Sequence, residues 1–302
     1  MRKKHIRTPS GVYIRQAVDK WKYHLLTHSD TLPEPQTFDF GMDDPSISNQ
    51  MPSYATKDFD IRRLCGKQIV AFGAGSVGGY TVWAIAPAQL VVHLFDSKKV
   101  EPKHTQTDRT IYDSTQIGQL KVKAAQYKVE SNFIGTRIIP KACDVAEVPD
   151  VELISLFKQS AIVILAIDDP AQILRINRLA YGLVEIVQIG VHRQGRSGHI
   201  AFSVPKKTPC LACTLNITSQ LDIHRLDSEP ASGVDIALIS IHAARVILEL
   251  INSKITGKPI TRWDPTRNLI YVSNTKQDVT PDGPGIHYES SQHRRPGCRI
   301  CQ

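Results

Sequence analysis

The sequence predicts an α/β fold with a Rossmann-like, mostly parallel sheet and helices on both faces. An apolar run leads into Gly73, Gly75 and Gly78, the glycine-rich loop, and a helical repeat follows. A strand, a tight turn and a helix in this order form an anion site at the helix N-terminus. A second apolar run, 90–95, ends in Asp96, where a carboxylate can reach a ribose hydroxyl. Further strand-like runs alternate with helical segments, which predicts parallel strands.

The predicted elements follow one another along the chain. Five apolar runs indicate parallel strands, near 68–73, 90–95, 137–140, 162–167 and 184–190. The clearest helix between them spans 118–132. Two later runs, 199–204 and 269–273, indicate antiparallel C-terminal strands. The segment 234–252 is apolar on most sides, so we expect a long buried helix.

The first 60 residues differ from the rest of the chain. An amphipathic repeat predicts one helix over residues 10–26, and residues 30–60, rich in Pro, Ser and Asp, predict a linker. We therefore expect an N-terminal extension, 1–60, and a nucleotide-binding domain, 61–302.

Composition narrows the class of protein. The 302 residues are 41% hydrophobic and 22% charged, as in an ordinary globular protein. The net charge of +8 suits an anionic ligand, but the basic residues are scattered without interleaved aromatics, which argues against a nucleic-acid partner. No run of 18 apolar residues occurs, and none follows the basic N-terminus. We therefore expect a cytoplasmic protein without a membrane span or secretory signal.

Four of the six cysteines form two matched pairs, Cys210 with Cys213 and Cys298 with Cys301. Each C-x-x-C turn places two thiolates on one side of a knuckle, and two knuckles give the tetrahedral four-sulfur site that Zn²⁺ prefers. A redox dithiol, the alternative, needs only one such pair. A closed four-cysteine site has no open coordination position, so we expect a structural rather than a catalytic metal.

Three charged residues follow the glycine-rich loop in order: Arg109, Lys121 and Asp168, the last after the apolar run 161–167. A dinucleotide pyrophosphate is satisfied by backbone amides and one helix dipole, whereas a triphosphate calls for further cations and an acid that holds a metal. A simpler interpretation of Asp96 and Asp168 is that they cap the helices that follow them.

With these motifs in this order, residues 62–302 resemble the ubiquitin-activating-enzyme superfamily in its short bacterial form, the ThiF/MoeB-type adenylyltransferases. The motifs are Gly73-Ala-Gly-Ser-Val-Gly78, Asp96, Arg109, Ile117-Gly-Gln-Leu-Lys121, Ile167-Asp168-Asp169, Pro209-Cys-Leu-Ala-Cys213 and Pro296-Gly-Cys-Arg-Ile-Cys301. The resemblance implies a homodimeric enzyme that uses Mg²⁺ and ATP to adenylate the C-terminal glycine of a ubiquitin-like or sulfur-carrier protein, with release of pyrophosphate.

The resemblance also implies a role for each motif. The glycine-rich loop would admit the nucleotide, and Asp96 would bind its ribose. Arg109 and Lys121 would neutralise phosphate charge, and Asp168 would hold Mg²⁺. Gln106 stands where the family has a phosphate-binding Asn, three residues before the arginine.

Two further positions are implied with departures from the family pattern. An arginine donated across the dimer belongs to a Tyr-x-Arg-Gln motif, which here makes Arg15 the candidate, far upstream, with Arg62 and Arg63 as alternatives. Members that pass the activated carrier on use a cysteine in the loop 214–233, and this chain has none there; the position falls near Ser228.

Three hypotheses follow for the step after adenylation at Ser228. The enzyme stops at the adenylate, or Ser228 accepts the acyl group as an oxyester with His224 as its base, or Ser228 is an ordinary loop residue.

Three other functions compete with activation of a carrier protein. The enzyme could adenylate another carboxylate, on a peptide or a tRNA. An NAD-dependent oxidoreductase shares the glycine-rich loop and Asp96 but leaves Lys121 and Asp168 unused. A non-catalytic nucleotide-binding scaffold is favoured by the changes at Gln106 and Asp169 and disfavoured by the retained Lys121 and Asp168.

Overall fold

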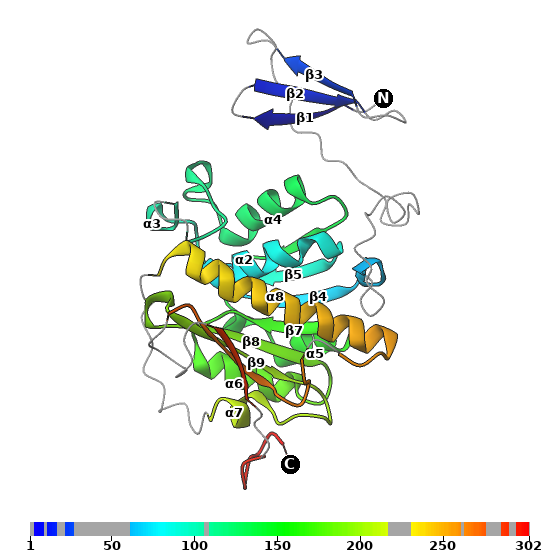
Figure 1. Ribbon diagram of the computed structural model, residues 1–302, viewed down its shortest axis with the longest axis vertical. Helices are drawn as coiled ribbons and strands as arrows, with labels where there is room; N and C mark the ends of the chain where they lie inside the picture. Colours follow the sequence, from blue (N-terminus) through cyan, green and yellow to red (C-terminus); the bar gives the residue numbers. More distant parts are fainter. Residues whose placement is uncertain are drawn as a thin grey trace. The chain divides into compact units, whose positions relative to one another are not determined.

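Figure 1 shows the computed structural model of the chain. It describes residues 61–105, 109–216, 231–260, 263–275, 285–289 and 294–301, together with three strands of the N-terminal segment. The chain divides into two compact units, Met1–Gly41 and Met42–Gln302. The two units are considered separately.

The N-terminal unit contains a three-stranded antiparallel sheet. Its strands are β1 (Lys3–Thr8), β2 (Gly11–Gln16) and β3 (Lys22–Leu26), with β2 in the centre. The helix expected over residues 10–26 is therefore wrong. The same apolar positions that suggest a helical repeat also fit strands, since Val12 and Ile14 alternate with Tyr13 along β2, and β-branched and aromatic residues favour strands. The linker expected over 30–60 lies outside the described residues.

The second unit is built on one eight-stranded sheet in the order β11-β10-β9-β8-β7-β4-β5-β6. Five strands run parallel: β4 (Gln68–Phe72), β5 (Val91–Phe95), β6 (Arg137–Lys141), β7 (Ile162–Leu165) and β8 (Glu185–His192). Three are antiparallel to their neighbours: β9 (Ser197–Ser203), β10 (Leu269–Ser273) and β11 (Gly285–Glu289). The predicted fold class, with antiparallel C-terminal strands, is confirmed; β11 was not predicted.

Helices cover both faces of this sheet (Figure 1). One face packs against α2 (Ser76–Ile85), α4 (Lys121–Asn132) and α8 (Gly233–Thr256), and the other against α5 (Asp150–Lys158), α6 (Pro170–Ala180) and the short α7 (Leu211–Thr214). The remaining elements are α3 (Pro102–Thr105) and the 3₁₀ turns η1 (Ile61–Leu64), η2 (Ala86–Ala88), η3 (Ser114–Gln116), η4 (Val145–Glu147) and η5 (Arg193–Gly195).

The central strand β4 shows why the sequence folds in this way. Residues 69–72 are all buried, and their side chains alternate between the two hydrophobic cores. Phe72 stacks near Phe95, with ring centroids 4.9 Å apart, and meets Phe157 of α5 edge-on. A continuous apolar run is what a strand covered on both faces requires.

The long helix α8 departs from its prediction. It is longer than expected and packs along α2, but Val234, Leu238 and Ile241 are 65%, 43% and 54% exposed. These three residues are spaced by four and three positions, so they form one exposed apolar stripe. The helix is therefore buried on one side only. None of the described helices is long and apolar enough to cross a membrane.

The strand order places the functional edge. From β4 the sheet grows through β5 and β6 on one side and through β7 and β8 on the other. Such a reversal creates a crevice beyond the carboxyl ends of the strands, between β4 and β7. The glycine-rich loop follows β4, Asp96 follows β5, and Asp168 follows β7, so all three lie along this edge.

Candidate functional site

The glycine-rich loop makes contacts that only glycine permits. Gly73 has φ of +94°, and a Cβ there would lie 2.3 Å from the carbonyl oxygen of Ala166, just beyond β7. A Cβ on Gly78 would lie 1.9 Å from the Gly73 carbonyl oxygen. Gly75, by contrast, has open space in front of it and stands directly before α2. The first amides of α2 therefore face an uncrowded volume suited to an anion.

Asp96 fixes the loop from the neighbouring strand. Its Oδ2 accepts the N–H of Ala74 at 2.8 Å, and its Oδ1 accepts the N–H of Lys98 at 2.8 Å. No helix begins directly after it, so the helix-capping interpretation is wrong for Asp96. Each carboxylate oxygen can accept a further hydrogen bond, which leaves capacity for a ligand hydroxyl.

Tyr112 is a site residue that the sequence did not reveal. Its hydroxyl donates toward the carbonyl oxygens of Ala74, at 2.5 Å, and Lys121, at 3.2 Å. Burial and the nearby charge of Asp96 raise the pKa of Tyr112, so the phenol stays protonated as a donor. Tyr112 thus joins the glycine-rich loop to the start of α4; it lies in a segment without helical or strand periodicity, so no pattern pointed to it.

Lys121 is the first residue of α4, and its side chain is buried against the same edge. Only 6% of the residue is exposed. Burial lowers the pKa of its amine, and the charge of Asp96 opposes that shift. A cation at a helix start is disfavoured by the helix dipole, and this one is desolvated as well. Such a position is costly for the fold alone and suits an anionic ligand.

The acidic pair after β7 divides its work. Asp169 Oδ1 accepts the N–H groups of Ala171 and Gln172 at 2.9 and 3.2 Å and so caps α6. Asp168 is exposed and makes no hydrogen bond or ion pair with the residues that the structure describes. The capping interpretation therefore belongs to Asp169, and the carboxylate of Asp168 remains available at the edge.

The other predicted site residues are placed less fully. Arg109 is half-buried and close enough to His104 for its charge to lower the pKa of that imidazole. Arg15 lies on β2 of the N-terminal unit. Gln106, His224 and Ser228 lie outside the described residues. Arg62 and Arg63, the alternatives to Arg15, are exposed on η1.

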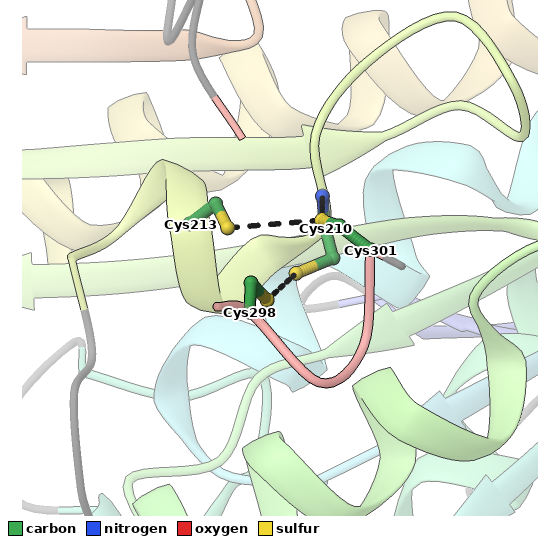
Figure 2. A group of neighbouring side chains, drawn as sticks. All are labelled: Cys210, Cys213, Cys298 and Cys301. Carbon is green, nitrogen blue, oxygen red and sulfur yellow. Dashed lines mark hydrogen bonds between the residues drawn. The ribbon is translucent and has the colours of Figure 1, made fainter. Parts of the chain in front are cut away.

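The four paired cysteines converge at one end of the second unit (Figure 2). The sulfurs of Cys210 and Cys298 are 3.7 Å apart, as are those of Cys213 and Cys301, and all four sulfurs lie within 4.8 Å of one another. Zinc–sulfur bonds of about 2.3 Å place the sulfurs of a tetrahedron about 3.8 Å apart. The cluster therefore has the geometry of a four-cysteine zinc site.

Further groups support the cluster. The N–H of Cys210 donates to the sulfur of Cys301 at 3.3 Å, and the N–H of Arg295 donates to that of Cys213 at 3.4 Å. Such N–H···S bonds favour thiolates. The redox alternative does not account for four sulfurs gathered around one centre.

Helix α6 carries two supporting residues that sequence reasoning missed. Asn177 is fully buried, and its Oδ1 accepts the N–H of Leu211 at 3.1 Å. Burial and the neighbouring Cys301 raise the pKa of Tyr181 to about 12. The two residues are four positions apart on one side of α6, and this spacing was the available signal. Because α6 begins at Asp169, it connects the strand edge to the cysteine cluster.

Taken together, the fold and these two sites define a Rossmann-like nucleotide-binding enzyme with a four-cysteine centre. The chain belongs to the ThiF family, whose profile matches residues 47–282. It is therefore an ATP-dependent adenylyltransferase that acts on a carboxylate. No curated protein matches the sequence.

Solved structures share the fold. Escherichia coli MccB with ATP is 16% identical, covers 80% of this chain and 68% of its own, and has a TM-score of 0.60. The microcin C7 biosynthetic enzyme MccB in complex with N-formylated MccA is 15% identical, covers 80% and 69%, and has a TM-score of 0.61. PaaA is 15% identical, covers 76% and 75%, and has a TM-score of 0.54.

Proposed function

We propose that this enzyme activates the C-terminal carboxylate of a polypeptide as an acyl adenylate, at the carboxyl edge between β4 and β7. One observation carries the proposal: the glycine-rich loop, Asp96, Lys121 and Asp168 come from four separate segments and meet at this edge. The loop and α2 offer amides to phosphate, and Asp96 offers oxygens to the ribose. Lys121 adds a buried cation beside them.

The chemistry requires positioning and charge stabilisation more than covalent work by the protein. A carboxylate oxygen attacks the α-phosphorus, the bond to the β-phosphate oxygen breaks, and the electron pair leaves with pyrophosphate. Lys121 and Arg109 neutralise the charge that moves onto this leaving group. The exposed, unpartnered carboxylate of Asp168 fits a Mg²⁺ ligand, and the ion would supply further charge neutralisation at the phosphates.

Two classes of polypeptide are candidates. The resemblance of the motifs favours a ubiquitin-like or sulfur-carrier protein that ends in glycine. The similarity of the fold to MccB, which has been solved with N-formylated and selenomethionine MccA, favours a short peptide, because both modifications belong to a polypeptide chain. Both classes present the same reacting group, a C-terminal carboxylate.

The remaining expectations complete the proposal. The cysteine cluster binds a structural Zn²⁺. The enzyme is a homodimer, which the exposed stripe of Val234, Leu238 and Ile241 on α8 supports, and Arg15 acts across the dimer. Residues 1–60 recruit the partner; the outer strands β1 and β3 present edges of the kind that peptides join by strand addition.

Exchange of labelled pyrophosphate into ATP tests the function. The full-length protein is mixed with Mg²⁺, ATP and candidate polypeptides encoded beside its gene, each with a free C-terminus or a C-terminal amide. We expect exchange only with a free carboxylate, because the amide cannot attack the α-phosphorus. Exchange that is equal with the amide, or reduction of NAD in place of exchange, contradicts the proposal.

The same reaction mixture tests the acyl-transfer hypothesis for Ser228. An oxyester on Ser228 gives a polypeptide–enzyme adduct that survives reducing agent, breaks in mild hydroxylamine and is absent from Ser228→Ala. If the wild-type enzyme catalyses exchange without such an adduct, the enzyme stops at the adenylate.

A further inference from the structure

His104 lies in α3, next to the cations assigned above to the phosphates, and has so far been given no role. Its ring nitrogen Nδ1 accepts the N–H of Glu101 at 2.8 Å. A ring nitrogen that accepts a hydrogen bond carries no proton, so the imidazole proton belongs to Nε2. His104 is therefore a neutral ring with one N–H donor that its own turn does not use.

Hydrogen bonds connect His104 to the glycine-rich loop. The hydroxyl of Thr110 donates to the carbonyl oxygen of His104 at 2.8 Å and accepts the N–H of Tyr112 at 3.2 Å. Tyr112 in turn donates its hydroxyl to the carbonyl oxygen of Ala74 at 2.5 Å. Three consecutive contacts thus hold α3 to the loop between β4 and α2, at the edge where the nucleotide is proposed to bind.

The charges that bear on His104 come from three segments of the same site. Burial lowers the pKa of the imidazole most, and Lys121 of α4, Lys103 of α3 and Arg109 lower it further, whereas Glu101 opposes them. Glu101 is itself paired with Lys103 at 2.8 Å. Three positive groups therefore surround the ring, and a second proton on it would add a fourth positive charge.

We propose that the Nε2–H of His104 donates a hydrogen bond to an oxygen of the β- or γ-phosphate of ATP. The inference rests on the proposed function, since it takes Lys121 and Arg109 as phosphate ligands. A neutral donor suits this position because it adds a hydrogen bond without adding repulsion among the cations of the free enzyme. Charge accumulates on the pyrophosphate as the α–β bond breaks, and a donor already in place strengthens its bond as that charge grows.

Two substitutions separate this role from a structural one. In His104→Asn the amide oxygen occupies the place of Nδ1, so the acceptor for the Glu101 N–H is kept and the distal donor is lost. In His104→Gln the amide nitrogen reaches the place of Nε2, so the donor is kept and the local acceptor is lost. We expect the Kd of ATP to stay within about threefold in the Gln variant and to rise about tenfold or more in the Asn variant. The Kd of AMP, which lacks the two outer phosphates, should be the same in all three proteins.

Titration calorimetry on the full-length protein decides between the roles. If the Asn variant keeps ATP affinity and the Gln variant loses it, or if neither loses it, His104 serves only its own turn and the inference is wrong. If the wild-type protein binds ATP no more tightly than AMP, the proposed phosphate site fails and the inference falls with it, a result distinct from the first two.

A spectroscopic measurement gives a second readout. A long-range ¹H–¹⁵N spectrum of the histidine rings, with the His104 signals identified by their loss in His104→Gln, should show a neutral ring protonated on Nε2. Those signals should shift when a non-hydrolysable ATP analogue is added. A doubly protonated ring, or one protonated on Nδ1, in the free protein would overturn the inference.

Discussion

Replacement of Asp168 by asparagine is expected to reduce pyrophosphate exchange by about two to three orders of magnitude. The carboxylate of Asp168 is exposed at the carboxyl edge and makes no interaction with the described residues, so an amide of the same shape leaves the fold unchanged. Asparagine lacks the negative charge with which Asp168 would hold Mg²⁺. The rate should be measured with the polypeptide that supports exchange in the wild-type enzyme, over a range of Mg²⁺ concentrations.

The neighbouring residue supplies the matched control. Asp169 caps α6 through the N–H groups of Ala171 and Gln172, and asparagine caps helices about as well as aspartate. Asp169→Asn should therefore keep most of the activity and stability. Equal losses in both variants, or a loss in Asp169→Asn alone, would mean that Asp168 is not the metal ligand.

Replacement of Cys301 by serine is expected to remove a structural zinc ion and to destabilise the protein by about 4 kcal/mol or more, as loss of a metal site does. This corresponds to a fall of roughly 10 °C in melting temperature for a chain of this size. The four sulfurs already have tetrahedral spacing and are mostly buried, so the remaining three leave one coordination position open. Metal analysis by mass spectrometry and a thermal scan measure the two effects.

Cys65→Ser serves as the control for the zinc experiment. Cys65 lies outside the cluster, and its thiol donates to the side-chain oxygen of Gln89 at 3.2 Å, a bond that a serine hydroxyl can also make. We expect one zinc per chain and a nearly unchanged melting temperature. A wild-type protein that contains no zinc as purified and is not stabilised by adding it would exclude the structural metal.

The strand edge could be predicted from the sequence because its residues follow patterned elements. Gly73, Asp96 and Asp168 each follow an apolar run long enough to be a strand, and parallel strands end at one edge of a sheet. The cysteine cluster could be predicted for a different reason. Two C-x-x-C turns specify their own local geometry, so only their convergence depended on the fold.

Residues that act across the fold escaped prediction. The hydroxyl of Tyr112 contacts Ala74, 38 positions away in the sequence, and the amide of Asn177 contacts Leu211, 34 positions away. No local pattern carries such a pairing, since it arises only when the sheet brings the segments together. The division of work between Asp168 and Asp169 was invisible for the same reason, because one residue of backbone direction decides which carboxylate turns back onto α6.

The N-terminal helix failed through competition between two periods. Apolar residues in the first 26 positions fit a helical repeat and also fit short alternating strands. Pairing between strands is not visible in one segment taken alone, because β2 is stabilised by β1 and β3 on either side. A local repeat therefore could not decide the structure of this unit.

The central claim is that the carboxyl edge binds ATP through its outer phosphates, with Lys121 as a buried cationic ligand. The most direct test compares the Kd of ATP and AMP for the wild-type protein, for Lys121→Met and for Lys123→Met, the last an exposed lysine on the same helix. We predict that ATP binds at least about tenfold more tightly than AMP, and that Lys121→Met removes this difference. Lys123→Met should preserve it. Equal affinity for ATP and AMP in the wild-type protein, or a preference for ATP that Lys121→Met leaves intact, would contradict the claim.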